Sequence, residues 1–428
     1  MMNRLRDGFL IGAATAAHQV EGNNVNSDCW VMENVPGSLY KEPSLDAADH
    51  YNRYEDDIKI MADAGLNAYR FSIEWARIEP TKGKFDEDEI EHYRKVLECC
   101  YKNNITPVVT LHHFSSPKWL ISEGGWEDDK TVHYFEDYCR YVVEKLGGMM
   151  PYICTINEAN MGLQIKKIMD KYAKGIRDRE KNVDIQVGLN KDVKVDMKAY
   201  YEALGEAFGI EPMKVQPFVA PRTAEGDKIV MRCHERARQV IKDINPDIKV
   251  GITLSLVDYH VLPGGERFAL ADQEEDFLHY LPYLQGDDFL GVQNYTRQVY
   301  GPNGVLKPAE GTKLTKMGYE YYPEALSGVV RFVSKHWDKP IMVTENGIST
   351  DNDADRVDFI ERALKGLYQC MEDGIEVIGY MHWSLLDNFE WQLGYEQKFG
   401  LIAVDRATQS RYPKRSLKCL GDINKYGI

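Results

Sequence analysis

The sequence predicts a single α/β domain, a (β/α)8 TIM barrel that spans residues 1–428, and three observations support this fold class. Short, apolar, β-branched runs alternate with longer segments of helical periodicity. Eight such runs occur, and repeated strand–helix alternation is typical of a parallel sheet that closes into a barrel. Polar or aromatic side chains follow most of the runs, at the strand ends where barrel enzymes build their active sites.

The predicted strands and helices alternate along the whole chain. The strands cover residues 9–14, 68–73, 107–111, 152–156, 250–254, 289–295, 341–344 and 377–382. Two of the intervening helices have clear ends, because Gly65 and Gly374 follow apolar residues that recur at helical spacing. No proline-rich linker or low-complexity tract divides the sequence, so we expect one domain.

Composition and charge restrict the class of partner. The chain is 43% hydrophobic and 28% charged, which provides enough apolar material for a large core. Its net charge of −15 argues against nucleic acid or an anionic membrane as the main partner. No apolar stretch approaches the ~20 residues that a membrane span needs. The sequence makes no prediction of an oligomeric state.

Two features of the sequence predict a cytoplasmic location. Eight scattered cysteines without a C-x-x-C pair are typical of reduced core thiols. Residues 9–17 follow Arg4 and Arg6 and superficially resemble a signal peptide, but Asp7 interrupts the pattern. Since residues 18–22 look like part of a site, we interpret residues 9–17 as a strand with its loop.

Two glutamates are the strongest candidates for catalysis. Glu158 and Glu345 lie at the ends of the fourth and seventh predicted strands, so we expect them to face each other across the barrel mouth. Paired carboxylates without metal ligands suit glycoside hydrolysis, in which one protonates the leaving oxygen and the other attacks or activates water. Arg70 is expected either near Glu345, where it would hold that carboxylate ionised, or buried as a structural partner of Glu74.

Other polar and aromatic residues at the strand ends favour a sugar ligand. No histidine or cysteine cluster accompanies His113, so a hydrogen bond to a substrate hydroxyl is a better prediction than a metal. Near the C-terminus, Trp383 and Trp391 flank the carboxylate of Glu390, and a pyranose offers C–H faces and paired hydroxyls to such groups. No phosphate loop or dinucleotide motif follows a strand.

Six segments carry a resemblance to a known family. They are Gly-Ala-Ala-Thr-Ala-Ala-His-Gln-Val-Glu-Gly at 12–22, Tyr-Arg-Phe-Ser-Ile-Glu-Trp-Ala-Arg-Ile at 69–78, Thr-Leu-His-His at 110–113, Asn-Glu at 157–158, Thr-Glu-Asn-Gly at 344–347 and Phe-Gly-Leu at 399–401. Together they span nearly the whole chain, which resembles the β-glycosidases of glycoside hydrolase family 1. The resemblance implies a (β/α)8 barrel, retention of anomeric configuration and no cofactor.

The resemblance also implies roles for individual residues. It makes Glu158 the acid/base and Glu345 the nucleophile, with Arg70 and Tyr295 as partners of Glu345. The implied sugar-binding residues are Gln19, His113, Asn157, Gln293, Tyr319, Trp383, Glu390, Trp391 and Phe399, with Trp383 as the sugar platform.

The departures from the family pattern concern the surroundings of the site. Gln293 replaces the usual asparagine, Phe114 and Tyr319 replace tryptophans, and Ala159 stands where the family often has proline. Residues 161–233 lack the expected Gly/Pro-rich pattern, so we predict an atypical helical insertion near the entrance of the active site. Ordinary cello-oligosaccharides are therefore expected to be poor substrates, and bulky or apolar aglycones better ones.

The sequence predicts a retaining exo-β-glycosidase that hydrolyses β-D-glucosides, with some tolerance of β-galactosides or β-fucosides. A small-molecule β-glycoside is thus the predicted partner. One alternative is a 6-phospho-β-glycosidase, although Glu390 and Trp391 would repel a phosphate. Another is an inactive sugar-binding homologue, although both glutamates are present.

Overall fold

The computed structural model describes residues 6, 8–173, 188–190 and 195–427. Its central feature is a sheet of parallel strands in the order β5-β4-β3-β2-β1-β12-β11-β8-β6. These strands are β1 (Leu10–Ala14), β2 (Ala68–Ser72), β3 (Thr106–His112), β4 (Tyr152–Ile156), β5 (Lys249–Gly251), β6 (Thr253–Ser255), β8 (Leu290–Gln293), β11 (Ile341–Asn346) and β12 (Val377–Trp383).

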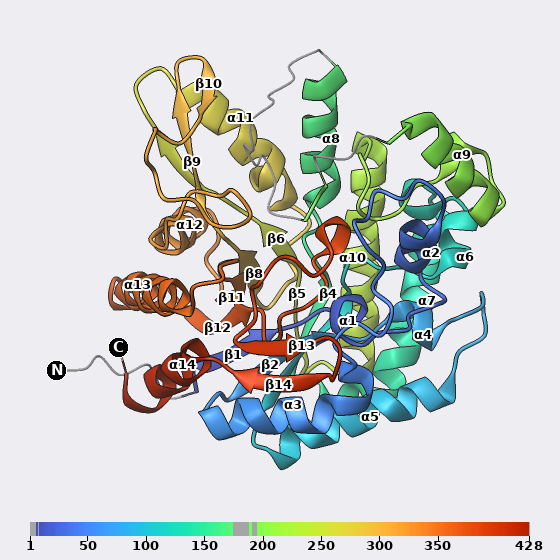
Figure 1. Cartoon of the computed structure of the whole chain (residues 1–428), viewed down its shortest axis with the longest axis horizontal. Coiled ribbons are helices and arrows are strands. Elements are labelled where there is room, and N and C mark those ends of the chain that lie inside the picture. Colours follow the sequence, from blue (N-terminus) through green and yellow to red (C-terminus); the bar gives the residue numbers. More distant parts are fainter. Residues whose placement is uncertain (1–5, 7, 174–187, 191–194, 428) are drawn as a thin grey trace.

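The fifth predicted strand closes the barrel. It is divided at Ile252 into β5, which pairs with β4, and β6, which pairs with β8. One chain segment thus joins the two edges of the sheet, and the (β/α)8 barrel predicted from the sequence is confirmed. Figure 1 shows the strands at the centre with the helices around them.

The outer helices begin and end where the local sequence favours it. They are α3 (His50–Ala64), α5 (Glu87–Lys102), α7 (Lys130–Leu146), α10 (Ala224–Ile244), α12 (Ala325–Val333), α13 (Asp353–Glu372) and α14 (Arg415–Tyr426). The Asp86 side chain accepts hydrogen bonds from two backbone amides at the start of α5, and the Asn352 side chain accepts one, from Ala354, at the start of α13. Gly65 ends α3 in the left-handed conformation, with φ 104°, as the sequence predicts.

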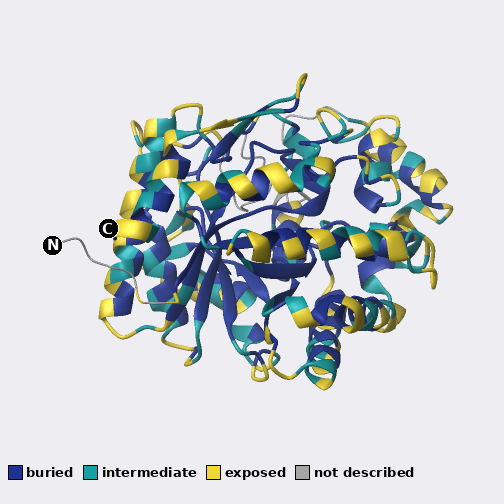
Figure 2. Cartoon of the chain, turned by 90° about the horizontal axis from the view of Figure 1, so that it is seen from below, coloured by how far each residue is buried: buried dark blue, intermediate teal, exposed yellow. Residues whose placement is uncertain are grey.

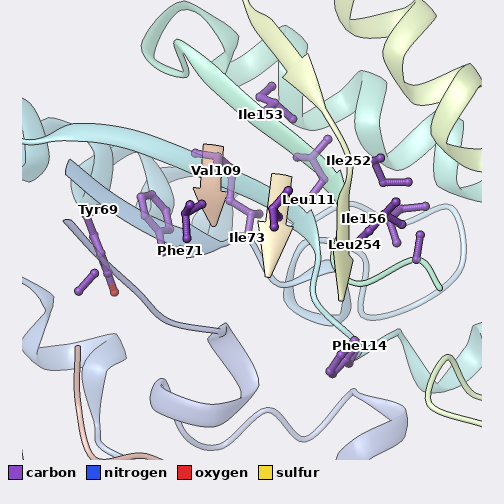
Figure 3. Packing of buried hydrophobic residues seen from close by; sticks show 14 of the residues in the cluster. Tyr69, Phe71, Ile73, Val109, Leu111, Phe114, Ile153, Ile156, Ile252 and Leu254 are labelled. Carbon is purple, nitrogen blue, oxygen red and sulfur yellow. The ribbon is translucent and has the colours of Figure 1, made fainter. Parts of the chain in front are cut away.

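Alternation along the strands separates two layers of core. Tyr69 and Phe71 of β2 belong to the apolar cluster between the barrel and its helices, which also contains residues of β3, β4 and β6 (Figure 3). Ala68 belongs to a second cluster inside the barrel, with Val108 and Cys154. Figure 2 shows that the strands are buried, whereas the helices carry exposed residues on their outer sides. Because side chains alternate between the faces of a strand, Arg70 lies on the same face as Ala68, inside the barrel.

Shorter elements cover the ends of the barrel. These include the helices α1 (Ala17–Val20), α2 (Asp28–Asn34), α4 (Trp75–Ile78), α6 (Lys118–Ser122), α8 (Met161–Ala173), α9 (Met197–Phe208) and α11 (Glu266–Asp276). A three-stranded sheet contains β7 (Asp258–Val261), β9 (Arg297–Gly301) and β10 (Gly304–Leu306), and β13 (Ile402–Asp405) pairs with β14 (Ser410–Pro413).

The segment 161–233, predicted as a helical insertion, is described only in part. Helices α8 and α9 and the first turns of α10 belong to it, whereas residues 174–187 and 191–194 lie outside the described residues. None of the described helices has both the length and the apolar character that crossing a membrane requires. All eight cysteines lie in the described part of the chain, and none of them forms a disulfide.

Candidate active site

The C-terminal ends of the barrel strands bring the predicted residues together. Because the strands are parallel, their C-terminal ends meet at one mouth of the barrel. The residues at this mouth are Arg70 on β2, His113 after β3, Asn157 and Glu158 after β4, Gln293 and Tyr295 at the end of β8, Glu345 on β11 and Trp383 on β12. All of them are at most 5% exposed, so the site is a buried polar cluster.

Glu345 is held by three hydrogen-bond donors. Arg70 Nη1 and Gln293 Nε2 donate to its Oε1 at 2.6 and 3.0 Å, and Tyr295 Oη donates to its Oε2 at 2.6 Å. The pairing of β11 with β8 shifts register between Val343 and Glu345, which places Glu345 opposite Gln293. Burial raises the pKa of the Glu345 carboxyl, while Arg70 and the other donors oppose the rise. The geometry therefore favours an ionised carboxylate.

Arg70 lies against Glu345 and not against Glu74. Its Nη2 donates to Asn157 Oδ1 at 2.6 Å, so one guanidinium bridges the residues that follow β4 and the carboxylate on β11. Glu74 instead accepts a hydrogen bond from the Ala76 backbone at the start of α4. Of the two positions that the sequence left open for Arg70, the structure shows the one beside Glu345.

Glu158 has a different environment from Glu345. Its backbone adopts the left-handed conformation, with φ 42°, and its amide donates to Thr253 Oγ1 at 2.9 Å. Burial, and then the charge of Glu345, raise the pKa of the Glu158 carboxyl well above its usual range. Because no cation pairs with Glu158 among the described residues, Glu158 is the member of the pair that keeps a proton.

The loop after β12 supplies a third buried carboxyl group. Gln19 Nε2 donates to Phe389 O at 2.6 Å and lies 3.5 Å from Glu390 Oε2. Burial and the charge of Glu345 raise the pKa of Glu390 to about 8. The rings of Trp383 and His113 stack with centroids 5.6 Å apart, so the indole forms one wall of the barrel mouth.

Several buried polar atoms at the mouth have no hydrogen-bond partner among the described residues. They are Gln19 Oε1, His113 Nδ1, Gln293 Oε1 and Tyr319 Oη. Burial, with the charge of Arg70, lowers the pKa of His113 well below its usual range, so its ring is neutral and can both donate and accept. Unpaired buried polar groups are rare in proteins, and four at one mouth indicate a ligand that carries several hydroxyl groups.

Comparison with known proteins identifies the family. The family model described as "Glycosyl hydrolase family 1" matches residues 1–427. The chain belongs to glycosyl hydrolase family 1. It is therefore a glycosidase of the retaining class, and the family predicted from the sequence motifs is confirmed.

Relatives of this family 1 glycosidase match along nearly their whole length. It is 30% identical to β-glucosidase A of Acetivibrio thermocellus, over 95% of each chain. It is 28% identical to a bifunctional β-D-glucosidase/β-D-fucosidase of Bifidobacterium breve, over 96% of this chain and 95% of the relative. Among solved structures, β-glycosidase BGL167 has 42% identity and a TM-score of 0.89, over 100% of this chain and 98% of that chain.

Two other predicted site residues of the family 1 glycosidase also lie at this mouth. Tyr319 is buried, and its ring centroid lies 6.4 Å from that of Tyr295. Phe399 packs edge-on against Tyr295 at 6.0 Å. A phenyl ring has no hydrogen-bonding group, so Phe399 contacts the site through packing alone.

His18 belongs to the segment 18–22 that looks like part of a site in the sequence, but the sequence gives it no role of its own. Its ring stacks on the indole of Trp391, with centroids 5.9 Å apart and an interplanar angle of 5°. Its Nε2 lies 3.4 Å from Glu33 Oε2, and both side chains are fully buried. Burial lowers the pKa of His18, but the hydrogen bond and charge of Glu33 outweigh it, so the net pKa is raised. The only signal in the sequence was its place beside Gln19 in the 12–22 motif.

Proposed function

We propose that this family 1 glycosidase is an exo-acting β-glucosidase in which Glu345 is the nucleophile and Glu158 is the acid/base. The assignment rests on the unequal environment of the two buried carboxyl groups. Glu345 receives hydrogen bonds from Arg70, Gln293 and Tyr295, whereas burial and the charge of Glu345 keep Glu158 protonated. Pairs of carboxyl groups whose pKa values are pushed apart are suited to separate acid and nucleophile roles.

The proposed reaction has two displacements at the anomeric carbon. In the first, a Glu345 oxygen bonds to that carbon while the bond to the leaving oxygen breaks, and Glu158 donates its proton to the leaving oxygen. In the second, Glu158 takes a proton from water, and the water oxygen displaces Glu345. Two inversions at the same carbon give net retention. Tyr295 and Arg70 hold Glu345 in position for attack and bind it again when it leaves.

The sugar would occupy the barrel mouth among the unpaired polar atoms. Gln19, His113, Asn157, Gln293 and Glu390 provide donors and acceptors for hydroxyl groups. Trp383 and Trp391 offer indole surfaces for the C–H faces of a pyranose. Relatives that are named β-glucosidases or a β-glucosidase/β-fucosidase support glucose as the principal sugar.

A 6-phosphoglycoside is the competing substrate, because a relative from Staphylococcus aureus with 28% identity is named 6-phospho-β-galactosidase. Among the described residues, no lysine or arginine forms an ion pair with Glu390. A phosphate at this position would meet a carboxyl group without a compensating cation. We therefore propose an unphosphorylated sugar.

We also propose a cytoplasmic location for the protein, as the sequence predicts.

Hydrolysis of 4-nitrophenyl β-D-glucoside and of its 6-phosphate tests the proposal. We expect turnover of the first substrate, little turnover of the second, and a β-configured glucose product when the reaction is followed by NMR within seconds. The Glu345→Gln variant serves as the inactive control. Turnover of the 6-phosphate alone, or release of the α-anomer, would overturn the assignment.

A further inference from the structure

The loop that follows β4 carries a buried amide that the proposed reaction does not use. Asn160 lies two residues after Glu158, immediately before α8, and is completely buried. Its Oδ1 accepts a hydrogen bond from the Ser255 amide at 3.0 Å, and its Nδ2 donates to Ser255 O at 2.8 Å. The same Nδ2 donates to Asp276 O at 3.0 Å. The side chain therefore uses its acceptor and both of its donors.

These hydrogen bonds complete one edge of β6. The strand pairs with β8 along its other edge. On the edge that faces the loop after β4, Ala159 N donates to Thr253 O at 3.1 Å. Asn160 then pairs with both backbone groups of Ser255. Because buried backbone amides and carbonyls need partners, the Asn160 side chain takes the place of a neighbouring strand.

The backbone of Glu158 depends on this support. Its φ of 42° lies in the left-handed region, which residues with a β-carbon rarely adopt. Such a conformation persists only where the surrounding structure fixes it. Thr253 Oγ1 accepts a hydrogen bond from the Glu158 amide at 2.9 Å, and the two residues after Glu158 are also hydrogen-bonded to β6. Contacts with β6 therefore fix the direction in which the Glu158 side chain leaves the backbone.

Ser255 also contacts the carboxyl group of Glu158. The side chains of Thr253 and Ser255 lie on the same face of β6, because they are two residues apart in a strand. Burial and then the charge of Glu345 raise the pKa of Glu158, and a hydrogen bond from the Ser255 side chain opposes this rise. Asn160 holds the amide and the carbonyl group of Ser255. It thereby sets the position of the hydroxyl group that touches Glu158.

A further set of hydrogen bonds supports Asn160 and Ser255. Gln164 Nε2 donates to Ser255 O and to Asp276 Oδ1, both at 3.1 Å. Tyr259 Oη donates to Asp276 Oδ2 at 3.3 Å. Because Asp276 O also accepts from Asn160, the start of α8 and the end of α11 are joined around Ser255. A buried network whose members are paired in this way favours a single arrangement of its groups.

We propose that Asn160 and Ser255 are positioning residues for the acid/base, and that together they hold the Glu158 carboxyl group towards the leaving oxygen. The proposal rests on the proposed function, because it needs Glu158 as the proton donor. Tyr295 contacts Glu345 instead, so the two carboxyl groups have separate supports.

Two variants and two substrates test this proposal. Asn160→Leu keeps a similar shape and removes three hydrogen bonds, whereas Ser255→Ala removes only the hydroxyl group. We expect each variant to lower kcat/KM for methyl β-D-glucoside about tenfold more than for 2,4-dinitrophenyl β-D-glucoside. Only the methyl glucoside needs a proton on its leaving oxygen in the first step. Ser255→Ala decides the proposal if Asn160→Leu does not fold.

Asn67→Leu is the matched control. Asn67 directly precedes β2 at the other end of the barrel. Its Oδ1 accepts from Ile11 N at 2.7 Å, and its Nδ2 donates to Phe9 O at 3.0 Å. This variant removes the same kind of pairing between a side chain and a strand backbone, so it should lower stability. It should leave the ratio of kcat/KM for the two substrates unchanged.

The pH profile of kcat/KM for 4-nitrophenyl β-D-glucoside gives a second readout. Loss of the Ser255 hydroxyl group should raise the pKa of Glu158, so the alkaline limb should shift to higher pH in Ser255→Ala. The acid limb, where Glu345 gains a proton, should move less. Equal losses on the two substrates would overturn this proposal, and so would an alkaline limb that stays in place. If Glu158→Ala itself shows no dependence on the leaving group, the proposed function fails instead.

Discussion

Arg70 Nη1 lies 2.6 Å from Glu345 Oε1, and both side chains are almost completely excluded from solvent. The same guanidinium donates to Asn157 at 2.6 Å, so one cation connects β2, β4 and β11 at the mouth of the barrel. A buried carboxylate keeps its charge only when such partners replace the water that it has lost. The pair therefore determines the ionisation of the proposed nucleophile.

Replacement of Arg70 by methionine should impair both activity and stability. Without the guanidinium, Glu345 takes up a proton at neutral pH and loses its nucleophilicity, so kcat should fall on the order of 10²-fold or more. Removal of one partner of this buried ion pair should cost about 3–5 kcal/mol of unfolding free energy. Kinetics with 4-nitrophenyl β-D-glucoside and guanidinium chloride unfolding measure the two effects. Arg53→Met, which removes a partly exposed ion pair with Asp49, is the matched control and should change neither quantity appreciably.

Substitution of the two glutamates should separate their roles by leaving group. Glu345→Gln should abolish hydrolysis of every glucoside, because no nucleophile remains. In Glu158→Ala the rate of glycosidic bond cleavage should fall about 10²–10⁴-fold for alkyl glucosides, because these need a proton on the leaving oxygen. With 2,4-dinitrophenyl β-D-glucoside the rate of this first step should fall far less. Added azide should then give a β-glucosyl azide that NMR detects. Equal losses on both substrates without an azide product would show that Glu158 is not the acid/base.

Removal of the Tyr295 hydroxyl should shift the acid limb of the pH profile of kcat/KM. Tyr295 Oη donates to Glu345 Oε2 at 2.6 Å, and this hydrogen bond favours the ionised carboxylate. In Tyr295→Phe the pKa of Glu345 rises, so the acid limb of kcat/KM should shift to higher pH. The alkaline limb, where Glu158 loses its proton, should move less. Tyr321→Phe, which removes a hydroxyl bonded to Asp358, should leave both limbs in place. An unchanged acid limb in Tyr295→Phe would contradict the prediction.

Stability should depend on pH through His18. Glu33, Glu74 and Asp28 face this ring, and the hydrogen bond and charge of Glu33 outweigh burial and raise its pKa. The stabilisation is therefore complete below the unfolded pKa of about 6.5 and is lost as pH rises through the folded pKa. His18→Phe, which keeps an aromatic ring against Trp391, should cost on the order of 3 kcal/mol at pH 6 and less at pH 9.

Denaturant unfolding at both pH values measures this difference. His133→Phe provides the control, because the His133 side chain is 80% exposed and should show no such trend. The KM for glucosides should also rise in His18→Phe if its contact with Trp391 positions the indole. A cost that is the same at pH 6 and pH 9 would mean that His18 is not protonated in the folded protein.

The architecture and much of the proposed site could be predicted because both depend on local patterns. Alternation of apolar runs with helical periods determines strand and helix positions, and parallel strands must place their C-terminal ends together. The runs at 68–73 and 341–344 therefore predict that Arg70 and Glu345 lie at one mouth of the barrel. Strand ends were less accurate, since β8 stops at Gln293 and β11 continues to Asn346.

Only the tertiary structure decided which of these residues meet. The sequence offered Arg70 two possible carboxylate partners, Glu74 and Glu345. Side chains of β2 alternate between its two faces, and the Arg70 side chain lies on the face inside the barrel, where it contacts Glu345. His18 and Trp391 are 373 residues apart along the chain, so no local pattern could show that their rings stack. An apolar cavity of about 390 Å³ likewise combines residues of α2, α8 and α9 with Phe114 and Trp391. Local periodicity determines whether each segment forms a strand or a helix. Packing between distant segments determines the contacts and burial of the side chains, and therefore their pKa values.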